Sequence, residues 1–337
     1  MINADTLPVI FIGLMGLAVL IYAVLDGYDL GVGILLPLSQ DAVHEQQRDT
    51  MIASIGPFWD ANETWLVLAI GLLLIAFPKA YNTVLFALYL PVTLLITGLI
   101  LRGVAFDFRA KVGTLYLKNI WDNIFKAGSL LASLSQGYML GLYIVGFEQS
   151  LESTLFAVTS ACCVTAAYTY IGASWLILKT EGTLQQHAVQ WTRRSGWLMA
   201  WGVILVSLVN LWISPDIFDR WLQNIYGILL LPVPLVCLTL FWINDRLLKR
   251  MSTTINNTDW IPFANITLIF VLCFVGLAFS FYPYIIPKQL TIWEAASATE
   301  SLEFLFWGAI FIIPTILLYT VYSYRVFWGK TQPLDYY

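Results

Sequence analysis

The first long apolar stretch of the chain, residues 7–25, reads LPVIFIGLMGLAVLIYAVL and contains no charged side chain. A helix needs about 20 apolar residues to cross the hydrocarbon core of a bilayer. Similar stretches recur along the 337 residues, of which 59% are hydrophobic and 11% charged, with a mean hydropathy of +0.76. A soluble domain carries about 25% charged residues, so this chain has too few polar side chains to cover a water-soluble surface. The sequence therefore predicts an all-α, polytopic membrane protein.

The same apolar pattern predicts nine transmembrane helices, joined by short segments. The predicted spans are 7–37, 52–78, 83–101, 127–146, 154–178, 196–213, 222–243, 262–286 and 303–324. No soluble domain, linker or internal repeat is visible, so residues 1–337 are expected to form a single integral membrane domain.

The positive charges predict how the chain is oriented. With the N-terminus outside, all of the 17 Lys and Arg residues except Lys79, Arg220 and Lys288 fall in segments on the inner side. Cytoplasmic segments of membrane proteins carry such an excess of Lys and Arg. We therefore expect an outer N-terminus, a cytoplasmic C-terminus and contact with lipid. The formal net charge of −4 gives no basic surface for nucleic acid.

Four acids interrupt the apolar pattern of the first two spans. Asp26 and Asp29 lie in the first span, and Asp60 and Glu63 lie in the second. Each pair is spaced i, i+3, which places both acids on one helix face. A charge at the centre of a membrane helix costs roughly 2.5–3.5 kcal/mol. The acids are therefore either solvated at the headgroup level or gathered in a buried cluster that relays protons from the cytoplasm.

The rise of a helix and the neighbouring residues favour the buried cluster. At ~1.5 Å per residue, Asp26 lies ~28 Å from Leu7 and Asp60 lies ~27 Å from Pro78, so the two acids are expected to be nearly level. Arg102, at the inner end of the third span, is expected to compensate part of their charge. Two further features belong to the same region: Asp122 near the inner face, and the small-xxx-small pair of Gly27 and Gly31, which lets another helix approach closely.

The chain offers few ligands for a haem or a metal. Its two histidines, His44 and His187, both lie in polar segments. Haem iron is usually held by an axial His, Met, Cys or Tyr. We therefore expect the chain to ligate neither haem nor a metal ion by itself.

Several motifs along the chain resemble subunit II of the cytochrome bd quinol oxidases. They are DGYDLGVG at 26–33, WDANETWL at 59–66, FDFR at 106–109, NIWD at 119–122, GASW at 172–175, KTEG at 179–182, YPY at 282–284 and LLYT at 317–320. Together they cover the whole chain in order.

The resemblance implies a fold of two four-helix bundles plus one peripheral helix. It also implies a heterodimer with the haem-bearing subunit I, which would hold haems b and d, oxidise quinol and reduce dioxygen in a bacterial inner membrane. By the same resemblance, Asp60 is the candidate for the first acid of a cytoplasmic proton path. Asp26, Asp29, Glu63, Arg102 and Asp122 match the same region, and Trp59, Gly27 and Gly31 are expected to serve structure or partner contacts.

The resemblance further allows for a structural quinone, because some members bind one in subunit II, and for a small single-helix accessory subunit. Two alternatives stay open at the level of sequence. The acids could hold helices or the partner in place, in a purely structural assembly subunit. The chain could instead be a cation-coupled secondary transporter, although such proteins tend to show inverted repeats.

Overall fold

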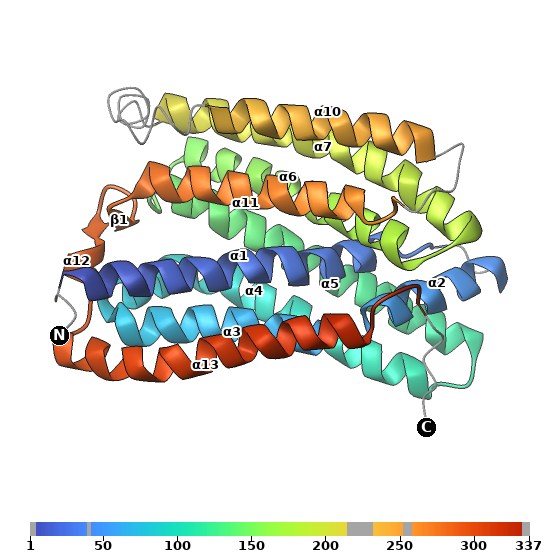
Figure 1. Ribbon diagram of the computed structural model, residues 1–337, viewed down its shortest axis with the longest axis horizontal. Helices are drawn as coiled ribbons and strands as arrows, with labels where there is room; N and C mark the ends of the chain where they lie inside the picture. Colours follow the sequence, from blue (N-terminus) through green and yellow to red (C-terminus); the bar gives the residue numbers. More distant parts are fainter. Residues whose placement is uncertain (1–4, 39–41, 214–231, 252–257, 332–337) are drawn as a thin grey trace.

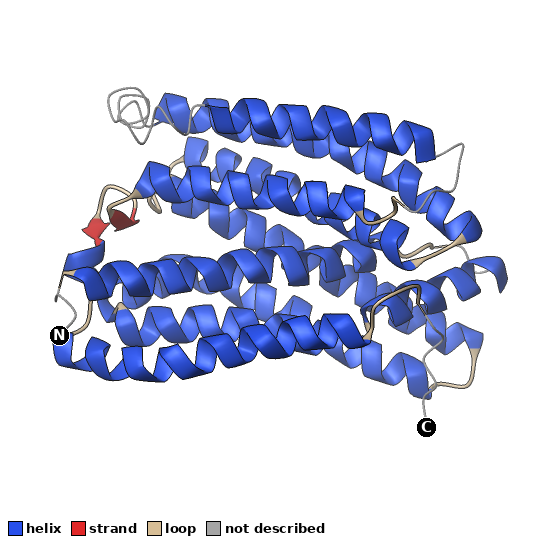
Figure 2. Ribbon diagram, viewed as in Figure 1, coloured by secondary structure: helices blue, strands red, loops and turns tan. Residues whose placement is uncertain are grey.

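The computed structural model describes residues 5–38, 42–213, 232–251 and 258–331. Most of them belong to long helices that lie side by side along the longest axis of the molecule (Figures 1 and 2). The helices are α1 (Thr6–Leu35), α2 (Ala42–Ile55), α3 (Trp59–Ala76), α4 (Pro78–Lys111), α5 (Leu115–Ile144), α6 (Leu151–Lys179), α7 (Gly182–Ile213), α10 (Pro232–Met251), α11 (Ile261–Phe281), α12 (Ile292–Ala295) and α13 (Thr299–Val326).

The two ends of the helix stack differ in structure. At one end, here called the α12 end, the antiparallel strands β1 (Tyr284–Ile286) and β2 (Leu290–Thr291) lead into α12, close to the start of α1. At the opposite end, here called the α2 end, α1 and α4 finish, α3 and α5 begin, and α2 lies against them (Figure 1).

Six of the described helices, α1, α3, α4, α6, α11 and α13, are long and apolar enough to cross a membrane. The prediction of a helical membrane protein is therefore confirmed. Three further predicted spans fall on α5, α7 and α10, and residues 222–231 of the seventh lie outside the described residues. The count of nine spans and their arrangement as two four-helix bundles stay predictions.

The lower hydropathy of α5 has a packing reason. Its buried face consists largely of small and hydroxyl side chains, among them Ser129 and Ser133, which donate hydrogen bonds to carbonyl oxygens of their own helix at 2.8 Å. A Cβ added at Gly98 of α4 would lie 2.8 Å from the carbonyl oxygen of Gly128 in α5. Small residues thus let α4 and α5 pack backbone to backbone, as they do between membrane helices in general.

Helix α1 lies at the centre of the fold and contacts α3, α5, α6, α11 and α13. Two of its glycines, Gly27 and Gly31, face α6. A Cβ at Gly31 would lie 1.9 Å from the carbonyl oxygen of Tyr168, and one at Gly27 would lie 2.8 Å from the ring of the same residue. Helix α6 reciprocates with Gly172, where a Cβ would lie 2.6 Å from the backbone of Gly31. This is the close helix approach that the spacing of Gly27 and Gly31 predicts.

The second predicted span needs a correction. The sequence suggests one helix over 52–78, but α2 ends at Ile55 and α3 begins at Trp59. Pro57 lies in the break and accounts for it, because proline has no N–H to donate and disfavours a helical conformation in the residue before it. Trp59 and Asp60 therefore form the first turn of a new helix at the α2 end.

At the α2 end, a cluster of aromatic rings packs α1, α6, α13 and the residue before α3 against one another. The rings of Tyr28 (α1) and Trp175 (α6) stack with centroids 4.2 Å apart, and those of Phe58 and Tyr324 (α13) stack at 4.5 Å. Phe58 precedes α3 and meets Trp175 edge to face at 5.7 Å. The cluster brings the end of α13 next to the acids of α1.

Candidate functional site: an arginine–carboxylate centre

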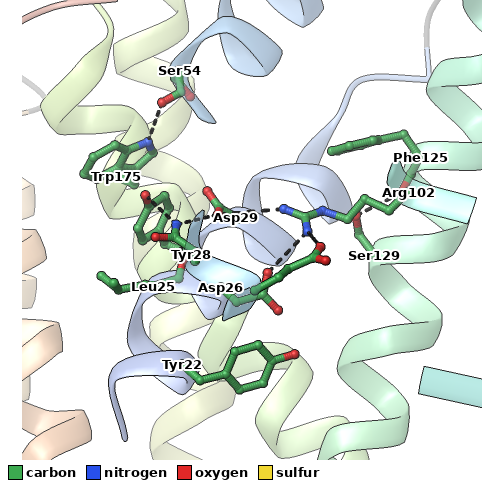
Figure 3. Close-up of polar contacts among 12 residues, drawn as sticks. Tyr22, Leu25, Asp26, Tyr28, Asp29, Ser54, Arg102, Phe125, Ser129 and Trp175 are labelled. Carbon is green, nitrogen blue, oxygen red and sulfur yellow. Dashed lines mark hydrogen bonds and ion pairs between the residues drawn. The ribbon is translucent and has the colours of Figure 1, made fainter. Parts of the chain in front are cut away.

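Arg102 is the hub of the candidate site. It lies on α4, is 0% exposed, and its side chain extends between Asp26 and Asp29 of α1 (Figure 3). Its Nη1 donates to Asp26 Oδ1 at 3.2 Å and to Glu63 Oε1 at 2.7 Å, and Nη2 lies 3.8 Å from Asp29 Oδ2. Three of the four predicted acids thus surround one guanidinium, which we call the Arg102 centre.

Aromatic rings close the centre on two sides. The guanidinium carbon of Arg102 lies 5.9 Å from the ring centroid of Trp59 and 5.6 Å from that of Phe125. A guanidinium over an aromatic face gains cation–π attraction, and more of it where water is absent. These rings help to fix Arg102 within reach of both helices that carry the acids.

The charges of the centre do not balance when every group is ionised. One guanidinium faces three carboxyl groups, of which Asp26 and Asp29 are 0% exposed and the side chain of Glu63 is 24% exposed. A buried charge is tolerated only when it is paired. Arg102 compensates one carboxylate, so the other carboxyl groups are the ones that can hold protons or release them.

Uncharged side chains extend the centre from Asp29 towards α13. Asn62 Nδ2 donates to Asp29 Oδ2 at 2.7 Å and to the Tyr28 hydroxyl at 3.1 Å. Tyr324 donates to Asn62 Oδ1 at 3.2 Å, and its hydroxyl lies 2.5 Å from that of Tyr28. This chain of hydrogen bonds joins α1, α3 and α13.

A second set of uncharged side chains lies one helical turn before Asp26. Tyr22, on α1, accepts a hydrogen bond from Gln136 Nε2 at 2.8 Å, and Tyr168 donates to Gln136 Oε1 at 2.6 Å. Gln136 belongs to α5 and Tyr168 to α6, so polar contacts continue from the centre towards the middle of the helix stack. No charged residue marks this extension in the sequence.

Asp60 lies apart from the centre. It is exposed in the first turn of α3 and forms no ion pair within the described parts of the chain. The helix instead brings Glu63, one turn further along, level with Asp26, since both bind the same nitrogen of Arg102. The alternative that all the acids are solvated is wrong for Asp26 and Asp29.

Asp122 belongs to a separate ionic cluster at the α2 end. Its carboxylate accepts from Arg109 Nε and lies 3.1 Å from Arg48 Nε, while Arg109 Nη2 lies 2.7 Å from Asp49 Oδ1. Asp122 is on α5, Arg109 on α4, and Arg48 and Asp49 on α2. The cluster holds α2 against the ends of α4 and α5.

The two histidines of the chain lie on helices away from the acids of α1 and α3. His44 lies on α2 and His187 on α7, where its ring packs 5.9 Å from that of Trp191. Neither histidine reaches the Arg102 centre, and the described residues contain no group of three or more His, Cys, Asp or Glu side chains able to hold a metal ion.

An apolar stack of helices with buried ion pairs among them defines an integral membrane protein with ionisable groups in its interior. Residues 7–327 match the family described as cytochrome bd terminal oxidase subunit II, and the chain belongs to this family.

Known relatives agree over nearly the full length. The chain is 25% identical to cytochrome bd-I ubiquinol oxidase subunit 2 of Escherichia coli (strain K12), over 99% of this chain and 98% of that protein. It is also 25% identical to cytochrome bd ubiquinol oxidase subunit 2 of Bacillus subtilis (strain 168), over 93% and 94%. A solved bd oxidase structure from Geobacillus thermodenitrificans shares the fold with a TM-score of 0.76 at 18% identity, covering 95% of this chain and 97% of that one.

Proposed function

We propose that the chain is the haem-free subunit II of a bacterial cytochrome bd-type quinol oxidase. The E. coli relative is named a ubiquinol oxidase subunit and matches this chain from end to end. Quinol oxidation and dioxygen reduction would take place at haems b and d of the partner, subunit I. This chain would support that subunit as a heterodimer and supply it with protons. A structural quinone and a small accessory subunit remain compatible with this assignment.

The gradient of exposure along α3 and α1 carries the proposal of a proton path. Asp60 is exposed at the start of α3, the side chain of Glu63 is 24% exposed one turn further, and Asp26 and Asp29 are 0% exposed. A proton taken up by Asp60 would pass to Glu63 and then to the carboxyl groups around Arg102. Each carboxyl group accepts a proton on one side and releases one on the other, so no net charge accumulates.

The distribution of cations supports uptake from the cytoplasm. At the α2 end lie Arg48, Arg109, Lys111, Lys118, Lys179, Arg325 and Lys330, whereas Lys79 and Lys288 lie towards the α12 end. By the positive-inside rule the α2 end faces the cytoplasm. The N-terminus would then be outside, and Asp60 would lie near the cytoplasmic surface of the bacterial inner membrane.

The proposal is tested in the assembled complex with Asp60→Asn and Glu63→Gln. We expect quinol oxidase turnover to fall by at least about tenfold, as for the loss of a proton-transferring group, with haem content per complex unchanged. Proton uptake by complexes in liposomes should slow in parallel. Asp107→Asn is the matched control, because Asp107 is an exposed acid of α4 at the same end and lies outside the Arg102 centre.

Two results would overturn the path. Full turnover and proton uptake in both variants would remove Asp60 and Glu63 from it. Loss of haem with unchanged turnover per remaining haem would instead assign these acids to assembly. Purification of the chain alone, without a haem-bearing partner, would contradict the assignment to an oxidase complex.

A further inference from the structure

A pocket of about 200 Å³ opens at the α2 end, between the last turn of α6, the start of α11 and the end of α13. Its walls are aromatic and are formed by Trp175, Trp260, Tyr324 and Trp328. Its charged side chains lie outside the Arg102 centre and take no part in the proton path proposed above, while Tyr324 also belongs to the hydrogen-bond chain that extends from Asp29. Since one water molecule occupies about 30 Å³ in the liquid, the pocket has room for several.

The charged groups of the pocket are two lysines and one acid. Lys330 Nζ donates to Asp259 Oδ2 at 2.7 Å, to the carbonyl oxygen of Thr180 at 3.0 Å and to that of Ile177 at 3.3 Å. These three acceptors use all three N–H groups of its ammonium. Asp259 Oδ2 also accepts from Gln185 at 2.9 Å. The charges of Lys330 and Asp259 therefore compensate each other.

Lys179 is left without a negative partner. Its ammonium donates to the carbonyl oxygens of Phe327 at 2.6 Å and Gly329 at 3.2 Å, and the residue is only 6% exposed. No carboxylate within the described ranges lies within ion-pair distance of it. Besides these carbonyl oxygens, its ammonium lies 5.5 Å from the ring of Phe58 and 5.1 Å from that of Trp175. Counted over the residues that the structure describes, the pocket thus has one positive charge in excess and one N–H of Lys179 without an acceptor.

The rim of the pocket is suited to a membrane surface. The side chains of Trp260 and Trp328 are 54% and 75% exposed, next to Phe327, which is 48% exposed. Indole rings collect at the level of lipid headgroups, where one edge is apolar and the other wet. An anion at this depth therefore has apolar side chains beside it that can receive acyl chains.

We propose that this pocket binds the phosphate group of an anionic phospholipid, with Lys179 as its counter-ion and the exposed tryptophans against the glycerol and upper acyl chains. A neutral headgroup leaves the excess charge uncompensated, whereas a phosphodiester with net negative charge neutralises it and accepts the spare N–H. Free phosphate shares this chemistry but gains nothing from the apolar rim.

The test uses the intact purified complex and native mass spectrometry, so its readout is independent of oxidase activity. The probes are phosphatidylglycerol, phosphatidylethanolamine and inorganic phosphate. We expect phosphatidylglycerol to be retained in preference to phosphatidylethanolamine. Lys179→Gln should weaken its retention by about tenfold or more, as for loss of a charge-assisted hydrogen bond, and Lys179→Arg should preserve it. Lys111→Gln, which removes an exposed cation from the same end, should have no effect.

Three results would overturn the proposal: equal retention of the two lipids, unchanged retention in Lys179→Gln, or displacement of phosphatidylglycerol by millimolar inorganic phosphate. Should Lys179→Gln fail to assemble, Trp328→Ser serves instead, because Trp328 is 75% exposed. It should lower retention of phosphatidylglycerol about threefold, while unaltered retention would count against the pocket.

Discussion

Arg102→Met removes the guanidinium that contacts Asp26, Asp29 and Glu63. The variant keeps most of the apolar stem of the side chain, but it is shorter and lacks the charged group that lies against Trp59 and Phe125. The carboxyl groups then face one another with no cation among the described residues close enough to pair with them.

The magnitude follows from the geometry. At an effective dielectric constant of about 20, opposite unit charges 3.2 Å apart, the separation of Arg102 Nη1 and Asp26 Oδ1, attract by about 5 kcal/mol. Desolvation offsets much of this attraction in the intact protein, but removing one partner from a buried pair costs about 3–5 kcal/mol. A change of 1 kcal/mol shifts the melting temperature by about 2–4 °C in proteins of 150–250 residues. We therefore expect a fall on the order of 10 °C.

The assay is thermal loss of the purified complex, followed by size-exclusion chromatography with haem absorbance. Arg102→Lys should lose less than Arg102→Met, since it keeps the charge but cannot reach both helices with a planar fork. Arg325→Met is the matched control, because Arg325 is exposed at the same end and should change stability by no more than about 0.5 kcal/mol. A melting temperature for Arg102→Met equal to that of Arg325→Met would show that the stability of the centre does not depend on its cation.

Three further outcomes are expected. Gly31→Ala should destabilise the complex by about 3 kcal/mol or more, because the new Cβ would lie 1.9 Å from a backbone oxygen of α6. Gly71→Ala is the control: a Cβ there has nothing within 4 Å, so it should be neutral or slightly stabilising in the same thermal assay. Tyr324→Phe should cost about 1 kcal/mol in that assay by removing hydrogen bonds while keeping the stacked ring, and a loss as large as that of Arg102→Met would contradict this. The backbone N–H of Thr291 donates to the exposed Glu294 carboxylate and lowers its pKa. The capping box of α12 should therefore be intact above the ordinary glutamate pKa of about 4.3, and it should be lost as the pH falls through the lower pKa of the folded state. Hydrogen exchange at the Thr291 amide should accordingly be faster in Glu294→Gln at neutral pH, and equal rates in the two proteins would exclude the carboxylate from the cap.

The acids were predictable because a charge inside an apolar run is conspicuous. Spacing alone placed Asp26 and Asp29 on one face of a helix, and Arg102 was the nearest cation in the next-but-one span. The structure brings all three together. What spacing could not decide is which acid of the second pair turns inward, since Asp60 and Glu63 share a face and differ by one turn in depth.

The uncharged members of the site escaped prediction for a physical reason. Asn62, Tyr324 and Gln136 carry no charge, and each matters only through a contact with a distant part of the chain. An amide within an apolar run was the available signal for Asn62 and Gln136. The ion pair of Arg48 with Asp122 was hidden in the same way, because it requires the chain to turn at Pro57 and lay α2 against α4 and α5.

The last described residues of the chain are hydrogen-bonded to the end of α6. Thr331 N donates to the carbonyl oxygen of Lys179, whose own ammonium binds the carbonyl oxygens of Phe327 and Gly329. A truncation that removes residues 327–331 would therefore remove the hydrogen-bond partner of the last carbonyl of α6. It would also remove the two carbonyl oxygens that accept from the Lys179 ammonium. Affinity tags and fluorescent fusions should accordingly be attached downstream of Thr331 through a spacer, so that they do not disrupt the hydrogen bonds between residues 327–331 and α6.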